Sequence, residues 1–208
     1  MTNILIPIAH RLLRNNLVYD SYQTCVGSVS YRRRLVRKLV SPNTLSFLDI
    51  GCGTASTVDL LPADAQYFGI DISESYLERA RNRRPGLQLF LGDVSESAWT
   101  KSINFDTATI CIALGIFHHL NDDELDFMLQ NCIKVLPKDS QIFSMDPIIT
   151  ESSSKGARWF AENDRGKYVR TYQQLENVFL RNKVVPTITI KKRQMRIPLD
   201  TVEISLRV

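Results

Sequence analysis

Short apolar runs alternate regularly with helix-like stretches from Leu45 onward, and few folds accommodate such a pattern. Five of these runs are long enough to form strands: Leu45–Ile50, Gln66–Ile72, Leu87–Leu91, Asp106–Leu114 and Gln141–Met145. The fourth run is nearly continuously apolar, which is typical of a strand that is buried on both faces. Strands that alternate with helices form a parallel sheet with helices on both sides. The sequence therefore predicts a doubly wound, mostly parallel α/β fold.

Two of the intervening helices have clear boundary signals. Ser75 and Glu78 form a capping-box pattern, which predicts a helix from Ser75 to Arg84. Asn121 can cap a second helix over Asp122–Val135, whose apolar residues form one stripe. These helices have the length that the connections of a parallel sheet require.

The last third of the chain has a different pattern. A helix is expected over Thr171–Leu180, with Thr171 and Gln174 as its capping box. Two strand-like runs follow, Val184–Lys191 and Pro198–Val208, with no helix between them. Strands joined without a crossover helix must be antiparallel. Before the sheet, the sequence predicts helices near Ile8–Leu17 and Val29–Leu39 that cover it.

The composition excludes several classes of protein. The longest uncharged apolar run, Ile110–Phe117, is far shorter than the roughly 18 residues of a membrane span. Residues 1–8 lack the basic start of a signal peptide. The four cysteines have no CxxC spacing and no evident ligand partners, so we expect reduced thiols, no metal site and a cytoplasmic protein: Cys25, Cys52, Cys111 and Cys132.

A glycine loop follows the first apolar run, within LDIGCGTAS (Leu48–Ser56). Gly51 and Gly53 let the backbone approach a ligand closely. Asp71 lies 20 residues after Gly51, at the end of the second run, where a carboxylate can accept hydrogen bonds from both ribose hydroxyls. Asp93 follows the third run in the same way. Three successive strands therefore end in a glycine or an acid at the edge where α/β sheets bind ligands.

Two kinds of cofactor combine with a glycine loop and a ribose-binding acid. A dinucleotide needs a third glycine near the helix that holds its pyrophosphate, and Ala55 and Ser56 stand in that region. Asp49, just before the loop, would repel a phosphate but attract a cation. S-adenosylmethionine carries a sulfonium and an amino group and no phosphate, so electrostatics favour it.

Four segments in this order resemble the successive motifs of class I S-adenosylmethionine-dependent methyltransferases, in particular a bacterial small-molecule type. They are LDIGCGT, YFGIDIS (Tyr67–Ser73), FLGDV (Phe90–Val94) and FDTATICIALGIFHHL (Phe105–Leu120). More loosely, VYDSYQ (Val18–Gln23) and DRGKYVRTYQQ (Asp164–Gln174) are similar to segments of the same branch. The resemblance implies a Rossmann-like sheet of seven strands whose last two form the antiparallel pair.

The resemblance also implies a cofactor-binding role for nine positions. Asp49, Gly51 and Gly53 would surround the methionine moiety, Asp71 and Ile72 the ribose region, Asp93 and Val94 the adenine, and Ala113 and Leu114 the space under the sulfonium. Ala55 departs from the family pattern, in which another glycine is common.

Methyl transfer needs a general base only when the acceptor must lose a proton. His118 and His119 are the candidates because histidine titrates near neutral pH; each could instead cap or pack the following helix. The residues after the fourth run are not the Asn/Asp-Pro-Pro-Tyr that family enzymes use on planar nitrogens. Asp146 alone is poor evidence for a metal, so none is expected. Tyr19 and Tyr22 belong to a lid over the cofactor or to the core.

Charge is unevenly distributed along the chain. Residues 45–151 contain 16 acids and seven bases, whereas the flanks contain six acids and 19 bases. The basic runs Tyr31–Lys38 and Lys191–Arg196 are either solvated helix faces and strand ends or a rim that attracts an anion. The acceptor is therefore expected to be a small molecule, with O- or N-methylation and an anionic compound favoured. An RNA methyltransferase and an inactive cofactor-binding scaffold are the alternatives.

The chain is expected to form one domain. Residues 1–44 would be a helical cover, residues 45–150 the cofactor-binding core, and residues 151–208 the acceptor side. No membrane partner is expected, and the sequence leaves the oligomeric state open.

Overall fold

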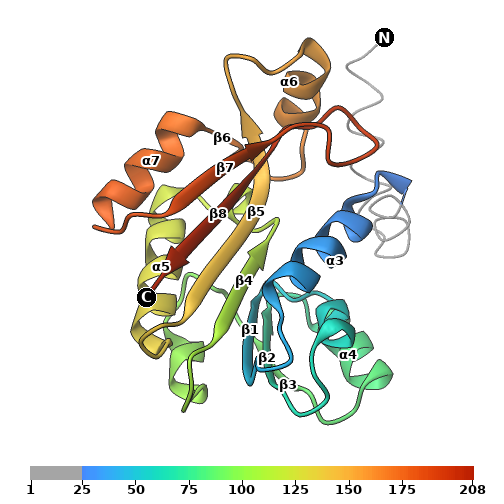
Figure 1. The fold of residues 1–208 in the computed structure, drawn as a ribbon, viewed down its shortest axis with the longest axis vertical. Helices are drawn as coiled ribbons and strands as arrows, with labels where there is room; N and C mark the ends of the chain where they lie inside the picture. Colours follow the sequence, from blue (N-terminus) through green and yellow to red (C-terminus); the bar gives the residue numbers. More distant parts are fainter. Residues whose placement is uncertain (1–24) are drawn as a thin grey trace.

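The computed structural model describes residues 25–208, which fold around one mixed β-sheet (Figure 1). Seven strands lie in the order β3-β2-β1-β4-β5-β8-β7, and the two-residue β6 pairs with β5. The strands are β1 (Ser46–Ile50), β2 (Gln66–Asp71), β3 (Gln88–Leu91), β4 (Ile110–Leu114), β5 (Gln141–Ile149), β6 (Arg170–Thr171), β7 (Thr187–Lys191) and β8 (Thr201–Arg207). This order confirms the predicted Rossmann-like sheet.

Strand direction divides the sheet into two parts. β1 to β5 pair in parallel, and each connection between them contains a helix. β8 runs antiparallel to both β5 and β7, with Ser144 opposite Ile204 and Ile188 opposite Ile204. The antiparallel pair at the end of the chain is therefore confirmed.

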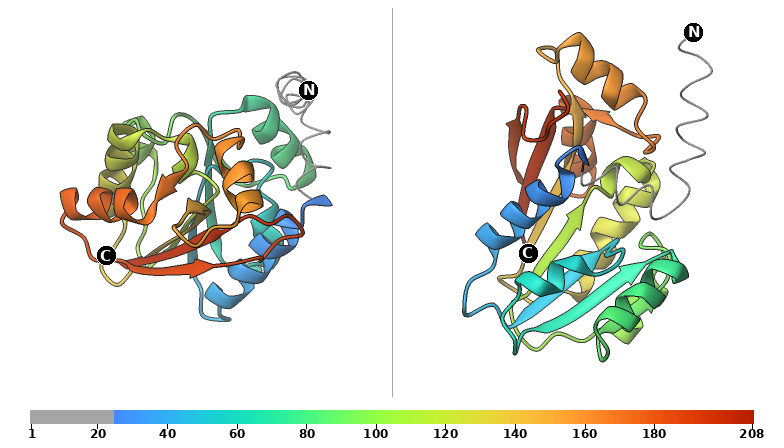
Figure 2. Two further views of the ribbon diagram at one scale, coloured as in Figure 1. Left: turned by 90° about the horizontal axis from the view of Figure 1, so that it is seen from above. Right: turned by 90° about the vertical axis from the view of Figure 1, so that its right-hand side faces the viewer.

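Helices cover both faces of the sheet, as Figure 2 shows from above. One face packs against α3 (Ser28–Leu39), the 3₁₀ turn η1 (Ser56–Leu60) and α4 (Glu74–Arg83). The other packs against α5 (Asp122–Val135), α7 (Tyr172–Arg181) and the 3₁₀ turn η2 (Ala98–Ser102). The remaining helix, α6 (Lys155–Glu162), follows the end of β5. The central strands β1, β4 and β5 are thus buried on both sides, as the fourth apolar run indicated for its own strand, whereas the edge strand β3 is partly exposed.

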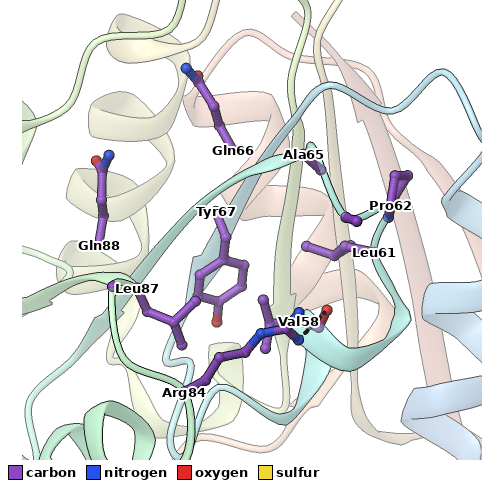
Figure 3. A pocket seen from close by; sticks show the side chains of 11 residues that line it. Val58, Leu61, Pro62, Ala65, Gln66, Tyr67, Arg84, Leu87 and Gln88 are labelled. Atoms are coloured by element: carbon purple, nitrogen blue, oxygen red, sulfur yellow. Dashed lines mark hydrogen bonds between the residues drawn. The ribbon is translucent and has the colours of Figure 1, made fainter.

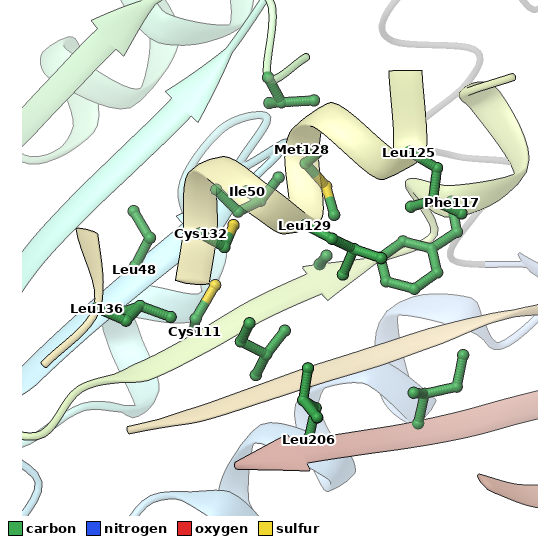
Figure 4. Close-up of a cluster of buried hydrophobic side chains, with 14 of the residues drawn as sticks. Leu48, Ile50, Cys111, Phe117, Leu125, Met128, Leu129, Cys132, Leu136 and Leu206 are labelled. Carbon is green, nitrogen blue, oxygen red and sulfur yellow. The ribbon is translucent and has the colours of Figure 1, made fainter. Parts of the chain in front are cut away.

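The apolar stripe of α5 forms the centre of one core (Figure 4). Met128, Leu129 and Cys132 face the sheet, where they meet the side chains of β1 and β4. Cys111 and Cys132 are both unpaired and buried, and the thiol hydrogen bond between them, together with burial, raises the pKa of Cys111. These cysteines act as small apolar side chains. All four cysteines are free thiols, as predicted.

Two strand boundaries differ from the prediction by four residues, and the other boundaries by three or fewer. β4 begins at Ile110 and not at Asp106, because residues 106–107 form a bend and residues 108–109 are not yet paired in the sheet. β5 continues through Asp146 and Pro147 to Ile149. The proline is tolerated because the chain resumes its pairing one residue later, where the N–H of Ile148 donates to the carbonyl of Asp200 at 3.0 Å.

The helix starts were predicted with mixed success. The capping box of Thr171 with Gln174 on α7 is present as expected, and Asn121 caps α5 as expected, in a capping box with Glu124 that was not predicted. The start predicted at Ser75 is wrong: α4 begins at Glu74 after Ser73, which makes no side-chain cap. The N–H of Ser73 instead donates to the carboxylate of Asp71, so a turn from the preceding strand begins this helix.

Helix α6 was not predicted, although Ser154 caps it by accepting a hydrogen bond from the N–H of Ala157. The helix expected near Ile8–Leu17 lies outside the described residues, as do Tyr19 and Tyr22. Among the residues that the structure does describe, no helix is long and apolar enough to cross a membrane.

Candidate functional site

The loops after β1 to β4 leave the sheet at one edge and carry the predicted site residues. In the glycine loop, Gly51 and Gly53 have φ angles of 67° and 55°, in the left-handed region that favours glycine. A Cβ atom on Gly51 would overlap the side chain of Ile116, whereas one on Gly53 would meet open space. Gly51 therefore permits internal packing, and Gly53 leaves the backbone open to a ligand.

Asp71, at the end of β2, holds this loop in place. One carboxylate oxygen accepts a hydrogen bond from the N–H of Gly53 at 2.8 Å, and the other accepts one from the N–H of Ser73 at 2.8 Å. Asp71 remains partly exposed, and the next residue, Ile72, is 71% exposed. An accessible carboxylate beside an accessible apolar side chain suits a ligand with a hydroxylated part and a flat apolar part.

Asp49 lies inside the core beneath η1. Its carboxylate accepts hydrogen bonds from the hydroxyls of Thr57 and Tyr67, the latter at 2.8 Å. Burial raises the pKa of Asp49 to about 6, and the two hydroxyls oppose that shift. Asp49 therefore supports the start of the glycine loop from within, and its direct contact with a methionine moiety stays a prediction.

The turn after β3 is fixed by short-range hydrogen bonds. Asp93 accepts from the N–H and the hydroxyl of Ser95, at 2.9 and 2.7 Å. Val94 is buried, and its carbonyl accepts from the indole of Trp99 at 3.2 Å. The turn is thus held on both sides of Val94, while the predicted adenine contacts stay untested.

The end of β4 forms the floor beside the glycine loop. Ala113 and Leu114 are buried and pair with β5, so their side chains belong to the core. Gly115 then turns the chain with a φ of 75°, and its N–H donates to the carbonyl of Met145 at 2.7 Å. This turn places Ile116 against Gly51.

His118 is buried between two carboxylates that come from other parts of the chain. Its Nδ1 lies 2.7 Å from Asp146 and its Nε2 lies 3.2 Å from Asp164. Burial alone would lower the pKa of His118, but the two carboxylates outweigh it and raise the pKa to about 9. A histidine that is protonated at neutral pH, with both nitrogens engaged, cannot accept a proton from an acceptor. This geometry favours a positioning role for His118 over the expected base role.

His119 has the opposite properties. Its ring lies 4.2 Å from that of His118 between centroids, and the residue is exposed. Partial burial of the ring and the positive charge of His118 lower the pKa of His119 to about 4. His119 is therefore neutral at pH 7 and retains a free proton-accepting capacity. Of the two histidines, it alone has the charge state that a base requires.

A second buried cation fixes the same loop. The guanidinium of Arg170 donates to the carbonyls of Phe117 and Leu120, both at 2.7 Å, and to the carboxylate of Asp122 at 2.8 Å. Gly166 packs so closely on the ring of His118 that a Cβ atom there would overlap it. Residues 164–170 therefore cover the loop that follows β4.

Sequence reasoning missed these covering residues. Asp146 was considered only as a metal ligand, and Asp164, Gly166 and Arg170 were noticed only within a segment of loose resemblance. Their partners lie 28 to 53 residues away, and no spacing rule connects such positions. The structure describes no cluster of His, Cys, Asp and Glu that could hold a metal ion, within residues 25–208.

The structure also brings the two basic runs together. The guanidinium of Arg34 on α3 donates to the side chain of Gln194 at 3.3 Å, and the N–H of Arg196 donates to the carbonyl of Val26 at 2.9 Å. We call the joined region the basic surface; it consists of Arg33, Arg34, Arg37, Lys38, Lys191, Lys192, Arg193 and Arg196. Within the described residues, none of these side chains is ion-paired with a carboxylate.

A separate cleft lies near the amino ends of β2 and β3 (Figure 3). Gln66 and Gln88, the first residues of those strands, line it together with Val58, Tyr67 and Arg84. The glycine loop and Asp71 are at the other ends of these strands. This cleft is therefore distinct from the predicted cofactor site.

Comparisons with known proteins agree with the fold and the order of the motifs. A family model described as "Methyltransferase domain" matches residues 47–139. An uncharacterized methyltransferase of Anoxybacillus flavithermus is 27% identical over 187 residues, which cover 85% of this chain and 82% of the relative. The 3-aminomethylindole N-methyltransferase of Hordeum vulgare is 29% identical over 106 residues, which cover 50% of this chain and 26% of the relative.

Solved structures share the fold at low sequence identity. A SAM-dependent methyltransferase from Archaeoglobus fulgidus has a TM-score of 0.70 at 13% identity, with 93% of this chain and 100% of that chain covered. The mitomycin 7-O-methyltransferase has a TM-score of 0.64 at 16% identity, with 93% and 58% covered. Residues 47–139 therefore match a methyltransferase domain, and the described chain has the fold of class I S-adenosylmethionine-dependent methyltransferases.

The residues at the sheet edge fit the cofactor of this class. Gly53 offers open backbone, Asp71 an accessible carboxylate, and Ile72 an exposed apolar side chain. All lie within one short stretch of the edge, as one elongated ligand requires.

Proposed function

We propose that the protein transfers a methyl group from S-adenosylmethionine to a small-molecule acceptor. The observation that carries this proposal is the cover that residues 164–170 form over the loop after β4, through Gly166, Asp164 and Arg170. A site with a cover from its own chain favours a compact acceptor over an extended one. The names of the Hordeum vulgare relative and of the mitomycin enzyme describe methylation of small molecules by proteins of this fold.

Different residues would bind the cofactor and align it with the acceptor. Bound S-adenosylmethionine supplies a methyl group on a positively charged sulfur. Gly51, Gly53 and Asp71 would hold the cofactor, and the turn at Asp93 would contact its base. Leu114 and Gly115 would form the floor on which donor and acceptor are aligned. Alignment and exclusion of water supply most of the rate enhancement that such a displacement needs.

His119 is the base that we propose for an acceptor that must lose a proton. It is exposed, neutral at pH 7 and adjacent to the end of β4. His118 would position it, because the buried ion pairs with Asp146 and Asp164 fix the neighbouring ring. A weakly basic histidine suits an acceptor that is itself easily deprotonated, such as an acidic phenol.

The basic surface supports an anionic acceptor. Its eight cations lie on α3, at the end of β7 and on the loop after it, and none of them forms an ion pair with a described carboxylate. Such a surface raises the local concentration of anions and speeds their association.

Two measurements in series test the proposal. Calorimetry should show that the purified protein binds S-adenosylhomocysteine. Transfer of radiolabelled methyl groups should then be measured for matched pairs of anionic and neutral aromatic acceptors, with His119→Gln as the variant and wild type as the reference. We expect the anionic member to be methylated faster and His119→Gln to lower its kcat. Binding without transfer to any acceptor would support an inactive scaffold. If His119→Gln keeps both the activity and the pH dependence of wild type, His119 is not the base.

The basic surface also supports a second candidate, an RNA acceptor. Binding to RNA would depend steeply on salt because each phosphate contact releases counterions. Retention of a mixed RNA sample at about 0.15 M salt, lost in a variant with Arg33, Arg37 and Lys192 changed to Gln, would favour RNA. We expect wild type to release the RNA below this salt concentration, which would favour a small-molecule acceptor.

A further inference from the structure

The basic surface extends well beyond the acceptor side of the sheet edge. At one end, Lys192 donates to the hydroxyl of Ser152 at 2.8 Å, in the loop between β5 and α6. From there the surface follows α3, whose 12 residues span about 18 Å, toward the amino end of β1 (Figure 1). Arg37 and Lys38, in the last turn of α3, therefore lie toward the edge opposite the glycine loop. A small acceptor held beside the glycine loop would reach only the first end.

The helix dipole accounts for only two of the eight cations, because it favours Arg37 and Lys38 in the last turn of α3. Arg33 and Arg37 are four residues apart on one face of the helix, and so are Arg34 and Lys38. Like charges at this spacing repel one another. No ion pair with a carboxylate of residues 25–208 relieves the repulsion. The folded protein is therefore stabilised when an anionic partner binds to this surface.

The extent of the surface limits the kind of partner. It is about as long as α3, and it borders a part of the chain with the opposite charge, since residues 45–151 contain 16 acids and seven bases. A nucleic-acid duplex or a membrane extends well past the ends of α3 and would meet these acids, which repel phosphate groups. A short acidic segment of a protein can end where the basic surface ends.

The side chains on the surface favour the same partner. The large apolar side chains that are exposed in the described chain lie outside α3 and outside residues 191–196. Unpaired bases need aromatic side chains on which to stack, and peripheral membrane helices need apolar side chains that insert. Five of the eight cations are arginines, whose planar guanidinium groups bind both oxygens of a carboxylate. The surface therefore suits the side chains of Asp and Glu.

We propose that the basic surface docks an acidic segment of a partner protein, which lies along α3 and reaches the acceptor side beside Lys192. Arg33 and Arg37 bind its carboxylates on the helix, and Lys191 and Arg193 bind them at the end of β7 and just beyond it. The inference goes beyond the proposed function, because docking requires neither the cofactor nor the acceptor.

Fluorescence anisotropy with a labelled poly-glutamate peptide tests this docking at about 0.15 M salt, with an RNA duplex of equal charge and phosphatidylserine vesicles as the alternative partners. Two double variants each remove two charges: Arg33→Gln with Arg37→Gln on α3, and Lys191→Gln with Arg193→Gln at the other end. Each should weaken binding of the peptide about 2- to 30-fold, the range for two exposed ion pairs. Wild type should bind the peptide more tightly than the duplex or the vesicles.

Lys134→Gln with Lys138→Gln is the matched control, because it removes two exposed charges at the end of α5, on the other face of the sheet. It should leave the affinity for the peptide unchanged, and an equal loss in this control would mean nonspecific attraction and overturn the inference. Unchanged affinity in the α3 variant would confine binding to the acceptor side and overturn it as well. Tighter binding of the duplex or of the vesicles would assign the surface to a nucleic acid or to a membrane instead.

Calorimetry with S-adenosylhomocysteine separates this inference from the proposed function. The substituted residues lie outside the predicted cofactor site, so every variant should bind this ligand as wild type does. If wild type does not bind it, the proposed function fails while the docking result stands. Circular dichroism shows whether each variant is folded, and Arg33→Lys with Arg37→Lys, which keeps both charges, should retain most of the affinity for the peptide.

Discussion

The two halves of the sheet edge are built in different ways. On the cofactor side, formed by the loops after β1 to β3, carboxylates accept mainly from backbone N–H groups nearby in sequence, as Asp71 and Asp93 do two residues on, and Asp71 also accepts from Gly53. On the acceptor side, formed by residues 115–122 and 164–170, buried cations join distant segments: His118 meets Asp146, and Arg170 meets Phe117. The first side depends on turns, and the second on buried charge. The second should therefore respond more strongly to pH and to loss of one partner.

Removal of Arg170 should have the largest effect on stability. Arg170→Met leaves two backbone carbonyls and Asp122 without their donor, which should lower the free energy of unfolding by about 3 kcal/mol. Urea unfolding measures this change. Arg181→Met is the control, because Arg181 also pairs with Asp122 but is exposed; it should cost less than about 1 kcal/mol. Equal losses of unfolding free energy in Arg170→Met and Arg181→Met would show that the buried contacts of Arg170 do not stabilise the protein.

The His118 ion pairs should make the acceptor side sensitive to alkali. Because the pKa of His118 is raised to about 9 in the folded protein from 6.5, its stabilisation is complete below pH 6.5 and is lost as the pH rises through 9. At pH 6, the free energy of unfolding of His118→Gln should be about 2–3 kcal/mol lower than that of wild type. This difference in unfolding free energy should be smaller at pH 10. His119→Gln should show the opposite trend: at pH 6 it should be slightly more stable than wild type, because His119 is neutral in the folded protein but largely protonated in the unfolded chain, and this difference should vanish by pH 10. A gap that stays constant with pH would refute the ion-pair assignment.

On the cofactor side, Asp71→Asn should affect binding more than stability. The amide keeps the size of the side chain but weakens its hold on Gly53 and on ribose hydroxyls, so affinity for S-adenosylhomocysteine should fall about 10-fold or more, at a cost of about 1 kcal/mol in unfolding free energy. Calorimetry and urea unfolding report the two effects. Asp64→Asn, at an exposed acid before β2, should change neither. A large loss of stability with intact binding would make Asp71 purely structural.

Ile72 should give the smallest change in stability. Because it is 71% exposed, Ile72→Ser should alter the free energy of unfolding by less than about 0.5 kcal/mol. Affinity for S-adenosylhomocysteine should nevertheless fall about threefold, through lost apolar contact. Leu180→Ser, at a 66% exposed position on α7, is the matched control and should leave affinity unchanged. Unaltered binding in Ile72→Ser would remove Ile72 from the site.

Particular residues show which structural features could be predicted from the sequence. The bounds of α5 and its cap at Asn121 were predictable because both follow from local hydrogen bonds and one apolar stripe. The same holds for the glycine loop, since left-handed φ angles at Gly51 and Gly53 are what that residue type favours. The start of α4 was not predictable from Ser75, because Asp71 of the preceding strand decides it.

The sequence by itself thus determined the sheet, its parallel and antiparallel parts, and the acids and glycines at its edge. These features depend on residue type and on spacing along the chain. Only the tertiary structure decided that His118 is an ion-paired cation, that His119 is neutral, and that the Nε atom of Arg32 has no partner among residues 25–208. Charge states and pairings depend on burial and on which distant segments meet, and the folded chain alone sets both.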